Sequence, residues 1–311
     1  RSPGGAAAFI ALALVLAGGC VSPRVPHKLQ DQSRPTVGIL YYPPAEPKGG
    51  GLPVRPFPAT TAWTDRAMRE DLRRIGRARV DVVFVVLRLD EDDSRALGRV
   101  VRFAKVAETV SDAPGLALWL RAQSGGVSSR QVRQFVDRLV RLGGLDVESW
   151  YEVAGRPLLV VEGAAVGLER HPAFAFQRAD GGASSWTPVP VDGVSAPRYG
   201  ADGGQALVSG GTWNAETQRW EVPRRGGATF RKQFRQAVVR GPELVIVSSW
   251  NDFSRGDFLT PHTELGDKAF RRLRAETEWL AEQTHPPNPR PPTPTSDRRP
   301  PTSETPTSPP P

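Results

Sequence analysis

Four apolar segments without polar alternation mark the first half of the chain. They cover residues 36–42, 81–89, 116–120 and 157–162, and they are rich in valine, isoleucine and leucine. Strands buried on both faces have this pattern, and such strands occur in parallel sheets that helices cover. We therefore expect four strands of a parallel sheet in this half.

Segments of helical periodicity lie between these strands. Met68, Leu72 and Ile75 recur at the spacing of one helix face, behind a capping residue at Thr64. Residues 94–110 form a second expected helix. The sequence thus alternates between strand and helix from its first apolar segment onward.

A third helix carries its own start signal. Ser128 and Gln131 have the spacing of a capping box, in which each side chain bonds the other residue's backbone N–H. The apolar residues Val132, Phe135 and Leu139 then follow at helical spacing. We expect this helix to pack on the strands with that face.

The pattern loosens after residue 162. Residues 173–178 and 189–196 are candidate strands, and glycine and turn residues are frequent up to residue 227. Regularity returns with a helix, a strand over residues 243–250 and a last helix. The apolar faces of the two helices are Phe230, Phe234 and Val238, then Phe270, Leu273 and Leu280.

Strand–helix alternation over about 250 residues is typical of a barrel or of a doubly wound sheet. No Gly-x-Gly-x-x-Gly follows a strand and no Gly-Lys-Ser/Thr loop is present, so nucleotide binding has no support. We predict an α/β fold, a (β/α)8 TIM-type barrel with an irregular second half, and no cofactor.

The start of the chain predicts export. Residues 9–17 form an apolar run that is too short to span a bilayer but fits a signal peptide, and small residues lead from it to Cys20. We expect a lipoprotein signal peptide over residues 1–20 and a lipid on Cys20 that anchors the protein to a bacterial membrane in the cell envelope. An ordinary cleaved signal is the alternative.

Two further segments are expected to be disordered. Residues 21–34 are a polar tether, and residues 284–311 are rich in proline, serine and threonine, without apolar residues to form a core. This leaves residues 35–283 for the barrel, about the length that such a fold needs.

The charge, the cysteine content and the histidine spacing restrict the kinds of partner and site that the protein can have. The net charge of +8 comes from arginines that are scattered over the expected helices, such as Arg69, Arg133 and Arg141, so no nucleic-acid partner is predicted. The single cysteine excludes an intramolecular disulfide, and the four histidines lack metal-ligand spacing. We predict no metal site; the oligomeric state stays open.

Polar and aromatic residues follow the expected strands, where a barrel carries its functional groups. Carboxyl groups can act as acid, base or nucleophile on a glycosidic bond, and aromatic rings can stack on sugars. The pattern therefore favours a carbohydrate partner. The residues at these strand ends are Tyr41, Tyr42, Asp90, Glu162, Trp250, Asn251 and Asp252.

The last expected strand carries a more specific pattern. Residues 247–256 read VSSWNDFSRG, and residues 266–270 read GDKAF. This resembles the end of the endo-α-mannosidase-like barrels, glycoside hydrolase family 99 and related family 71/99-like proteins, whose pattern is Ser-Trp-Asn-Glu-Trp-x-Glu-Gly. GILYYP at residues 38–43 and WYEVAGRPLLV at residues 150–160 fit the same order.

The resemblance implies two catalytic glutamates three residues apart, a base acting on the sugar 2-hydroxyl and an acid that protonates the leaving oxygen. Asp252 stands at the first position and Arg255 at the second. Arginine stays protonated and cannot act as a general acid. We predict impaired catalysis unless Glu162 or Asp257 supplies the acid. Arg255 is itself a candidate substrate contact, which could pair with acidic sugars.

Three functions stay open. The chain could be a barrel that binds carbohydrate with impaired catalysis, in which Tyr41, Tyr42, Asp90, Trp250 and Asn251 contact the sugar. It could be an active glycoside hydrolase on a mannose-type or acidic polysaccharide, or a non-catalytic protein-interaction module of the envelope. Whether it is an enzyme, and on which sugar and linkage, the sequence leaves undecided.

Overall fold

The structure is a computed structural model that describes most of the predicted barrel. The described residues are 27–28, 34–43, 64–89, 93–121, 127–162, 172–179, 190–191, 194–195, 198–199, 205–214, 219–252, 257–261 and 266–284. The predicted signal peptide with Cys20, the tail from residue 285 on, Asp90 and Arg255 lie outside them.

The first half alternates strand and helix as predicted. The capping box of Ser128 and Gln131 is formed, and the Thr64 hydroxyl accepts from the Ala67 N–H at 3.2 Å. These caps satisfy backbone groups that a helix start leaves without partners. The elements are β2 (Thr36–Tyr41), α1 (Asp65–Arg77), β3 (Val82–Arg88), α2 (Asp93–Glu108), β4 (Gly115–Arg121), α3 (Ser129–Arg141) and β6 (Arg156–Glu162).

The strands form a TIM-type barrel. Seven of them are parallel, in the order β7 (Ala175–Ala179), β6, β4, β3, β2, β14 (Leu244–Ser248) and β11 (Gln205–Ser209). The eighth, β10 (Arg198–Tyr199), pairs antiparallel with β11. The pairing of β14 with β2 joins the last parallel strand of the chain to the first.

The second half departs from strict alternation. Between β6 and β11 the described residues include no helix. The predicted strand over residues 189–196 is wrong: β8 (Pro190–Val191) and β9 (Val194–Ser195) are two short antiparallel strands of their own sheet. The barrel strand β11 was not predicted, because its five residues lie within glycine-rich sequence. The second half is irregular, as expected.

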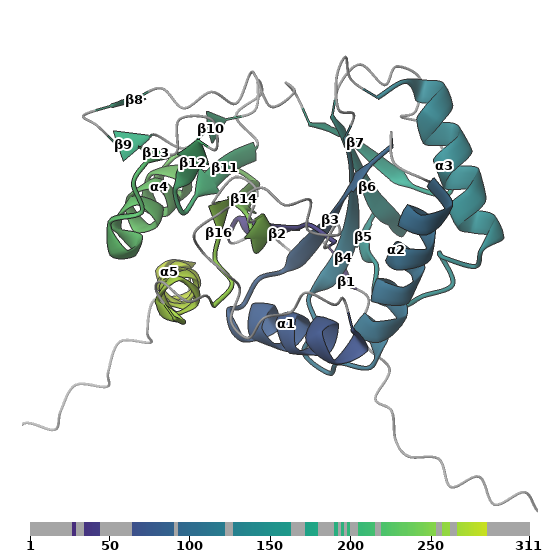
Figure 1. Cartoon of the computed structure of the whole chain (residues 1–311), viewed down its shortest axis with the longest axis horizontal. Helices are drawn as coiled ribbons and strands as arrows, with labels where there is room; N and C mark the ends of the chain where they lie inside the picture. The colour runs from purple at the N-terminus through teal and green to yellow at the C-terminus, as the bar shows by residue number, and fades with distance from the viewer. Residues whose placement is uncertain are drawn as a thin grey trace, which may run out of the picture.

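Helices return at the end of the chain. They are α4 (Ala228–Val239), which follows the 3₁₀ turn η1 (Arg225–Gly227), and α5 (Lys268–Thr284). In Figure 1, α1, α2 and α3 cover the part of the sheet from β2 to β6, and α4 and α5 lie on the other side. The remaining short strands are β1 (His27–Lys28), β5 (Tyr151–Val153), β12 (Thr212–Asn214), β13 (Arg219–Val222), β15 (Asn251–Asp252) and β16 (Asp257–Phe258).

Because the strands are buried on both faces, the core consists of two apolar layers, one inside the barrel and one between the strands and the helices. The inner layer contains strand residues without any helix residue, so it fills the inside of the barrel. Its centre is Phe84, whose ring stands edge-on to that of Trp119 with centroids 5.5 Å apart. A Cβ at Gly38 would overlap the Phe84 ring. Glycine is therefore required there to make room for the phenylalanine.

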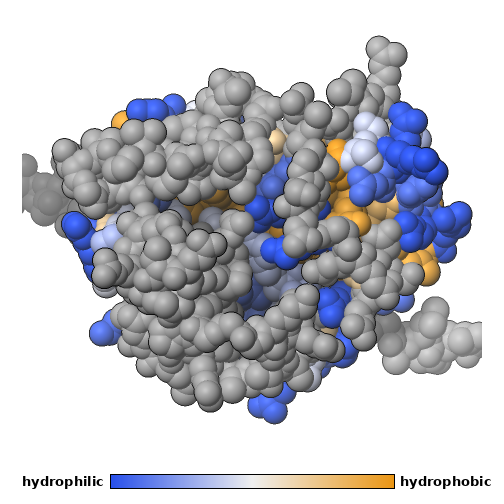
Figure 2. All heavy atoms as spheres, turned by 45° about the horizontal axis from the view of Figure 1, so that its top comes forward, coloured by the Kyte–Doolittle hydropathy of each residue, from blue (hydrophilic) through white to orange (hydrophobic). Residues whose placement is uncertain are grey.

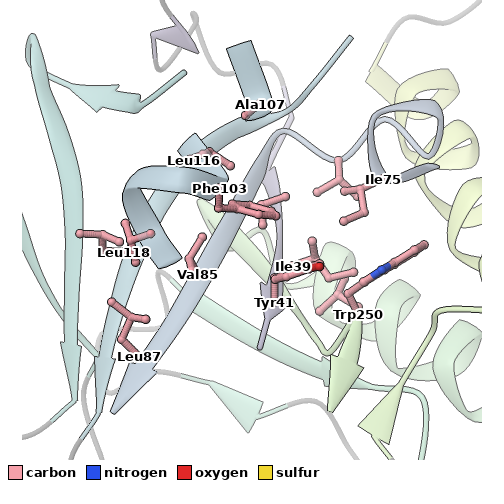
Figure 3. Packing of buried hydrophobic residues seen from close by; sticks show 14 of the residues in the cluster. Ile39, Tyr41, Ile75, Val85, Leu87, Phe103, Ala107, Leu116, Leu118 and Trp250 are labelled. Atoms are coloured by element: carbon pink, nitrogen blue, oxygen red, sulfur yellow. The ribbon is translucent and has the colours of Figure 1, made fainter. Parts of the chain in front are cut away.

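The outer layer joins strands to helices. It contains Met68, Leu72 and Ile75 of α1 together with residues of β2, β3 and α2. Figure 3 shows Ile39 and Tyr41 of β2 beside Phe103 of α2 within this layer. The helix face predicted from the spacing of the α1 residues is thus the one that packs on the barrel.

None of the helices in the described part of the chain is long and apolar enough to cross a lipid bilayer.

Candidate functional site

A polar network joins four strand ends of the barrel. Glu162, at the end of β6, accepts from the Trp119 indole N–H at 2.7 Å and from Arg121 Nε at 2.9 Å, with one carboxylate oxygen for each donor. Arg121 also donates from Nη1 to the Tyr42 hydroxyl at 3.0 Å. The network therefore runs across β6, β4 and β2, with the side chain of Asn251 beside Tyr42.

Asn251 extends the pairing between the first and last strands. Its Oδ1 accepts from the Tyr42 N–H at 2.8 Å and its Nδ2 donates to the Tyr42 carbonyl at 2.7 Å. The backbone N–H of Trp250 donates to the Leu40 carbonyl at 2.8 Å. One side-chain amide thus replaces a backbone partner beyond the end of β14. We call the group of Tyr42, Arg121, Glu162 and Asn251 the mouth cluster.

The ion pair of the mouth cluster is mostly, but not fully, buried. The side chains of Arg121 and Glu162 are 13% and 15% exposed. Hydrogen bonds in such a partly dry position are stronger than they are in water. Both carboxylate oxygens already receive a donor, so Glu162 is placed to hold and orient groups rather than to give a proton away.

Hydrophilic side chains are also visible at the surface. In the view of Figure 2 the molecule is hollowed near its centre, and hydrophilic side chains line the hollow, with hydrophobic ones beside it.

Tyr41 and Trp250 lie elsewhere than predicted. They are 1% and 0% exposed and belong to the outer layer between strands and helices. Tyr41 packs on Phe103 with ring centroids 4.9 Å apart, and Trp250 stands edge-on to Phe270 at 6.2 Å. Figure 3 shows both rings within this packing. A ring enclosed on both faces cannot stack on a sugar, so we remove these two residues from the predicted substrate contacts.

A carboxylic acid from α1 lies under these two rings. The Tyr41 hydroxyl donates to Asp71 Oδ2 at 3.0 Å. The buried Trp250 indole nitrogen makes no hydrogen bond within this structure, although it is close enough to influence the same carboxyl. The pKa of Asp71 is raised from 3.8 to about 6, mainly because burial outweighs the smaller lowering effects of Trp250, Tyr41 and Arg74, and Glu70 raises it slightly.

Two predicted acids lie on the adjacent strands of a hairpin. Asp252 of β15 and Asp257 of β16 are register partners in an antiparallel pair that follows β14. Directly opposed residues of such a pair hold their Cβ atoms about 5 Å apart. The backbone thus brings together two acids that the sequence had placed five positions apart.

Three residues near these sites were not predicted. Arg121 ends β4 as Glu162 ends β6, so the same rule would have selected it, whereas Trp119 lies inside β4. Asp71 had no such signal, because a single acid on an amphipathic helix usually faces water.

Other features do not form a comparable site. A groove of about 450 Å³ lies on the outside of α1 and α2, lined by Asp65, Arg69, Val101, Arg102 and Lys105 among others. None of its described lining residues is aromatic. Within the part of the chain that the structure describes, no three His, Cys, Asp or Glu side chains are grouped to hold a metal ion.

The comparisons with known proteins identify the fold. No protein-family model and no curated protein matches the sequence. Among solved structures, two of the GH99 endo-α-mannosidase from Bacteroides thetaiotaomicron are similar to this chain. The TM-score is 0.60 for the complex with bis-tris-propane and 0.59 for the other structure. Each match covers 79% of this chain and 98% of the mannosidase at 16% identity.

A second solved structure agrees with the first. A protein described as glycoside hydrolase-like matches with a TM-score of 0.53 and 10% identity, over 78% of this chain and 94% of its own. Identities this low establish the fold alone. The resemblance found in the sequence is therefore confirmed at that level: the chain folds as a GH99-like TIM-type barrel.

Proposed function

We propose that this protein is a carbohydrate-binding barrel of the glycoside hydrolase type in which catalysis is impaired. The observation that carries the proposal is the mouth cluster, a connected set of polar groups at the carboxyl ends of parallel strands in a GH99-like barrel. Barrels of this kind place their functional groups at that end.

The chemistry of the cluster suits a sugar. Sugar hydroxyls both donate and accept hydrogen bonds, and they pair well with carboxylate, guanidinium and amide groups whose positions are fixed. Arg121 and Glu162 fix one another, and Asn251 is fixed by two backbone bonds to Tyr42. Groups held in this way lose little conformational entropy when a ligand binds.

Impaired catalysis rests on the acid position. Arg255 stands where the family pattern has its general acid, and Asp252 has a shorter side chain than the glutamate at the base position. Glu162 is occupied on both oxygens by Trp119 and Arg121. General acid help is worth about 10²- to 10⁴-fold in rate, so its loss would leave little turnover of an unactivated glycoside.

A second candidate function is an active glycoside hydrolase. The register pairing of Asp252 with Asp257 favours it, because glycoside hydrolysis uses a pair of carboxylic acids and the backbone brings these two residues together. In this case Asp257 would replace the missing acid. A third candidate, a protein-interaction module, would show neither sugar binding nor turnover.

Binding and turnover measured together separate these functions. The purified protein is tested on α-mannan and on acidic polysaccharides, for affinity by calorimetry and for new reducing ends. We expect binding without reducing ends, binding weakened at least tenfold in Glu162→Gln, and no change in the control Glu282→Gln on the exposed side of α5. Undiminished binding by Glu162→Gln would remove the mouth cluster from the proposal.

Activated substrates test the acid directly. A nitrophenyl or fluoride glycoside needs no protonation of its leaving group, so we expect the wild type to cleave it slowly. This reaction should disappear in Asp252→Asn. The variant Arg255→Glu should cleave the activated substrate and, in addition, a natural glycan. Efficient wild-type cleavage of a natural glycan that both Asp252→Asn and Asp257→Asn abolish would establish the second candidate instead.

The place of action is proposed from the sequence. The apolar run and Cys20 support an exported lipoprotein of the cell envelope. Cys20→Ala is expected to abolish labelling with a radioactive fatty acid and to release the protein from membranes. Normal processing and membrane retention of this variant would leave the ordinary signal peptide.

A further inference from the structure

Two neighbouring residue pairs divide their side chains between the two faces of the barrel wall. At the end of β2, Tyr41 points to the helices and Tyr42 to the mouth cluster. After β14, Trp250 packs in the helix layer while Asn251 bonds the backbone of Tyr42. The two outward rings and the two inward polar groups therefore share the same short stretches of backbone.

Asp71 of α1 lies where the two outward rings meet. Its carboxyl accepts from the Tyr41 hydroxyl at 3.0 Å, and the buried Trp250 indole, which has no hydrogen-bond partner, influences the same carboxyl. We propose that Asp71 is a positioning residue for the mouth cluster: it holds the ends of β2 and β14 from the helix side and, through its protonation state, adjusts how firmly Tyr42 and Asn251 are placed.

The ionised form is the one that binds the Tyr41 hydroxyl more strongly and attracts the Trp250 indole N–H. A carboxylate accepts charge-assisted hydrogen bonds, which are about twice as strong as neutral ones. The Tyr41 and Trp250 donors each favour this form, whereas burial favours the protonated one. The pKa of about 6 shows that burial prevails, so both forms of Asp71 are populated near that pH.

Among the described residues, few other charges act on this carboxyl. On α1 itself, Arg74 favours the ionised form and Glu70 opposes it. The residues that pack on the two rings from α2 and α5 are Phe103 and Phe270, which carry no charge. The proton of Asp71 is thus the main variable charge at this junction.

The inference rests on the proposed sugar site, so its test has one arm without ligand. Backbone amide shifts of Tyr42 and the side-chain amide of Asn251 are followed by NMR from pH 4.5 to 7.5. We expect them to titrate with a midpoint near pH 6 in the wild type and to stay constant in Asp71→Asn. Glu70→Gln is the control on the same helix, and it should keep the titration at a slightly lower midpoint.

The second arm measures binding of soluble α-mannan at pH 5 and pH 7. We expect the affinity of the wild type to rise about fivefold from pH 5 to pH 7, which is the lower end of the usual coupling between two sites. The affinity of Asp71→Asn should not depend on pH. Tyr41→Phe keeps the ring but loses the hydroxyl, so it should move the NMR midpoint upward.

The outcomes separate the two ideas. If α-mannan and acidic polysaccharides fail to bind while the amides titrate, the sugar site is refuted and the positioning role stands. If the amides titrate identically in Asp71→Asn, or show no change near pH 6, the positioning role is overturned whatever binds.

Discussion

From β2 to β4, each strand is followed by a helix that covers its outer face, whereas the described residues between β6 and β11 include no helix. The regular part builds its core from periodic residues such as Leu72 and Phe103. The later part holds its strands through pairing with neighbours, as β11 pairs with β14. One barrel is thus completed by two kinds of sequence, and the mouth cluster takes residues from both.

The largest expected effect tests whether the two parts unfold together. Phe103 of α2 and Phe234 of α4 are both fully buried in the same outer layer. Replacing either by alanine should lower the free energy of unfolding by about 3 to 5 kcal/mol, through lost burial and a cavity. Urea denaturation followed by circular dichroism measures this change.

Both variants should keep a single transition, because the two residues belong to one continuous core. Val239→Ala is the control, since Val239 is 83% exposed. Two separate transitions in Phe234→Ala would mean that the irregular part unfolds on its own.

The second effect lies at the junction of the two parts. The folded protein holds the Asp71 proton with a pKa of about 6, against 3.8 for an ordinary aspartate, so stability falls as pH rises from about 4 to 6. This change of pKa corresponds to about 3 kcal/mol. Asp71→Asn should lose that part of the pH dependence, and thermal unfolding at pH 4 and pH 7 measures the difference.

A third, smaller effect belongs to the regular part. Glu162→Gln leaves the Arg121 charge without its partner and should cost about 1 to 3 kcal/mol of stability. The matched control is Asp65→Asn, whose pair with Arg102 is about half exposed and should cost under about 1 kcal/mol. Equal losses in the two variants would show that burial of the mouth pair has no energetic consequence.

The smallest effects compare two helix starts. Ser128 caps α3 through its side chain, so Ser128→Ala should cost about 1 kcal/mol and Ser128→Thr much less. Helix α4 begins after Gly227, which has φ of 89° and no side-chain cap. Gly227→Ala should also cost about 1 to 2 kcal/mol of stability, but because alanine is strained in the left-handed backbone conformation. Denaturant midpoints of the three variants test this difference.

The sequence predicted the regular part well because its signals are local. The box of Ser128 and Gln131 and the α1 face of Met68, Leu72 and Ile75 depend on residues within one or two turns. Strand β11 was missed because its position depends on pairing with β14, which no local pattern encodes.

The site was predicted in part for a related reason. A strand buried on both faces shows no alternation, so its residues do not tell which face each side chain takes. Trp250 was expected at the mouth, but β14 ends at Ser248 and the indole packs in the helix layer. Glu162 and Asn251 were expected near the mouth and lie in its cluster. Arg121 ends β4 and the same rule could have selected it, whereas Asp71 needed the structure.

The bonds between Tyr42 and Asn251 join residues that are 209 positions apart. A ribosome makes the chain from its N-terminus at about 5 to 20 residues per second, so β2 leaves the exit tunnel long before its neighbour β14 exists. Through that interval one edge of β2 has no partner from its own chain, and an open strand edge can pair with another molecule. The barrel of this protein therefore closes between β2 and β14 only after its last parallel strand has been made.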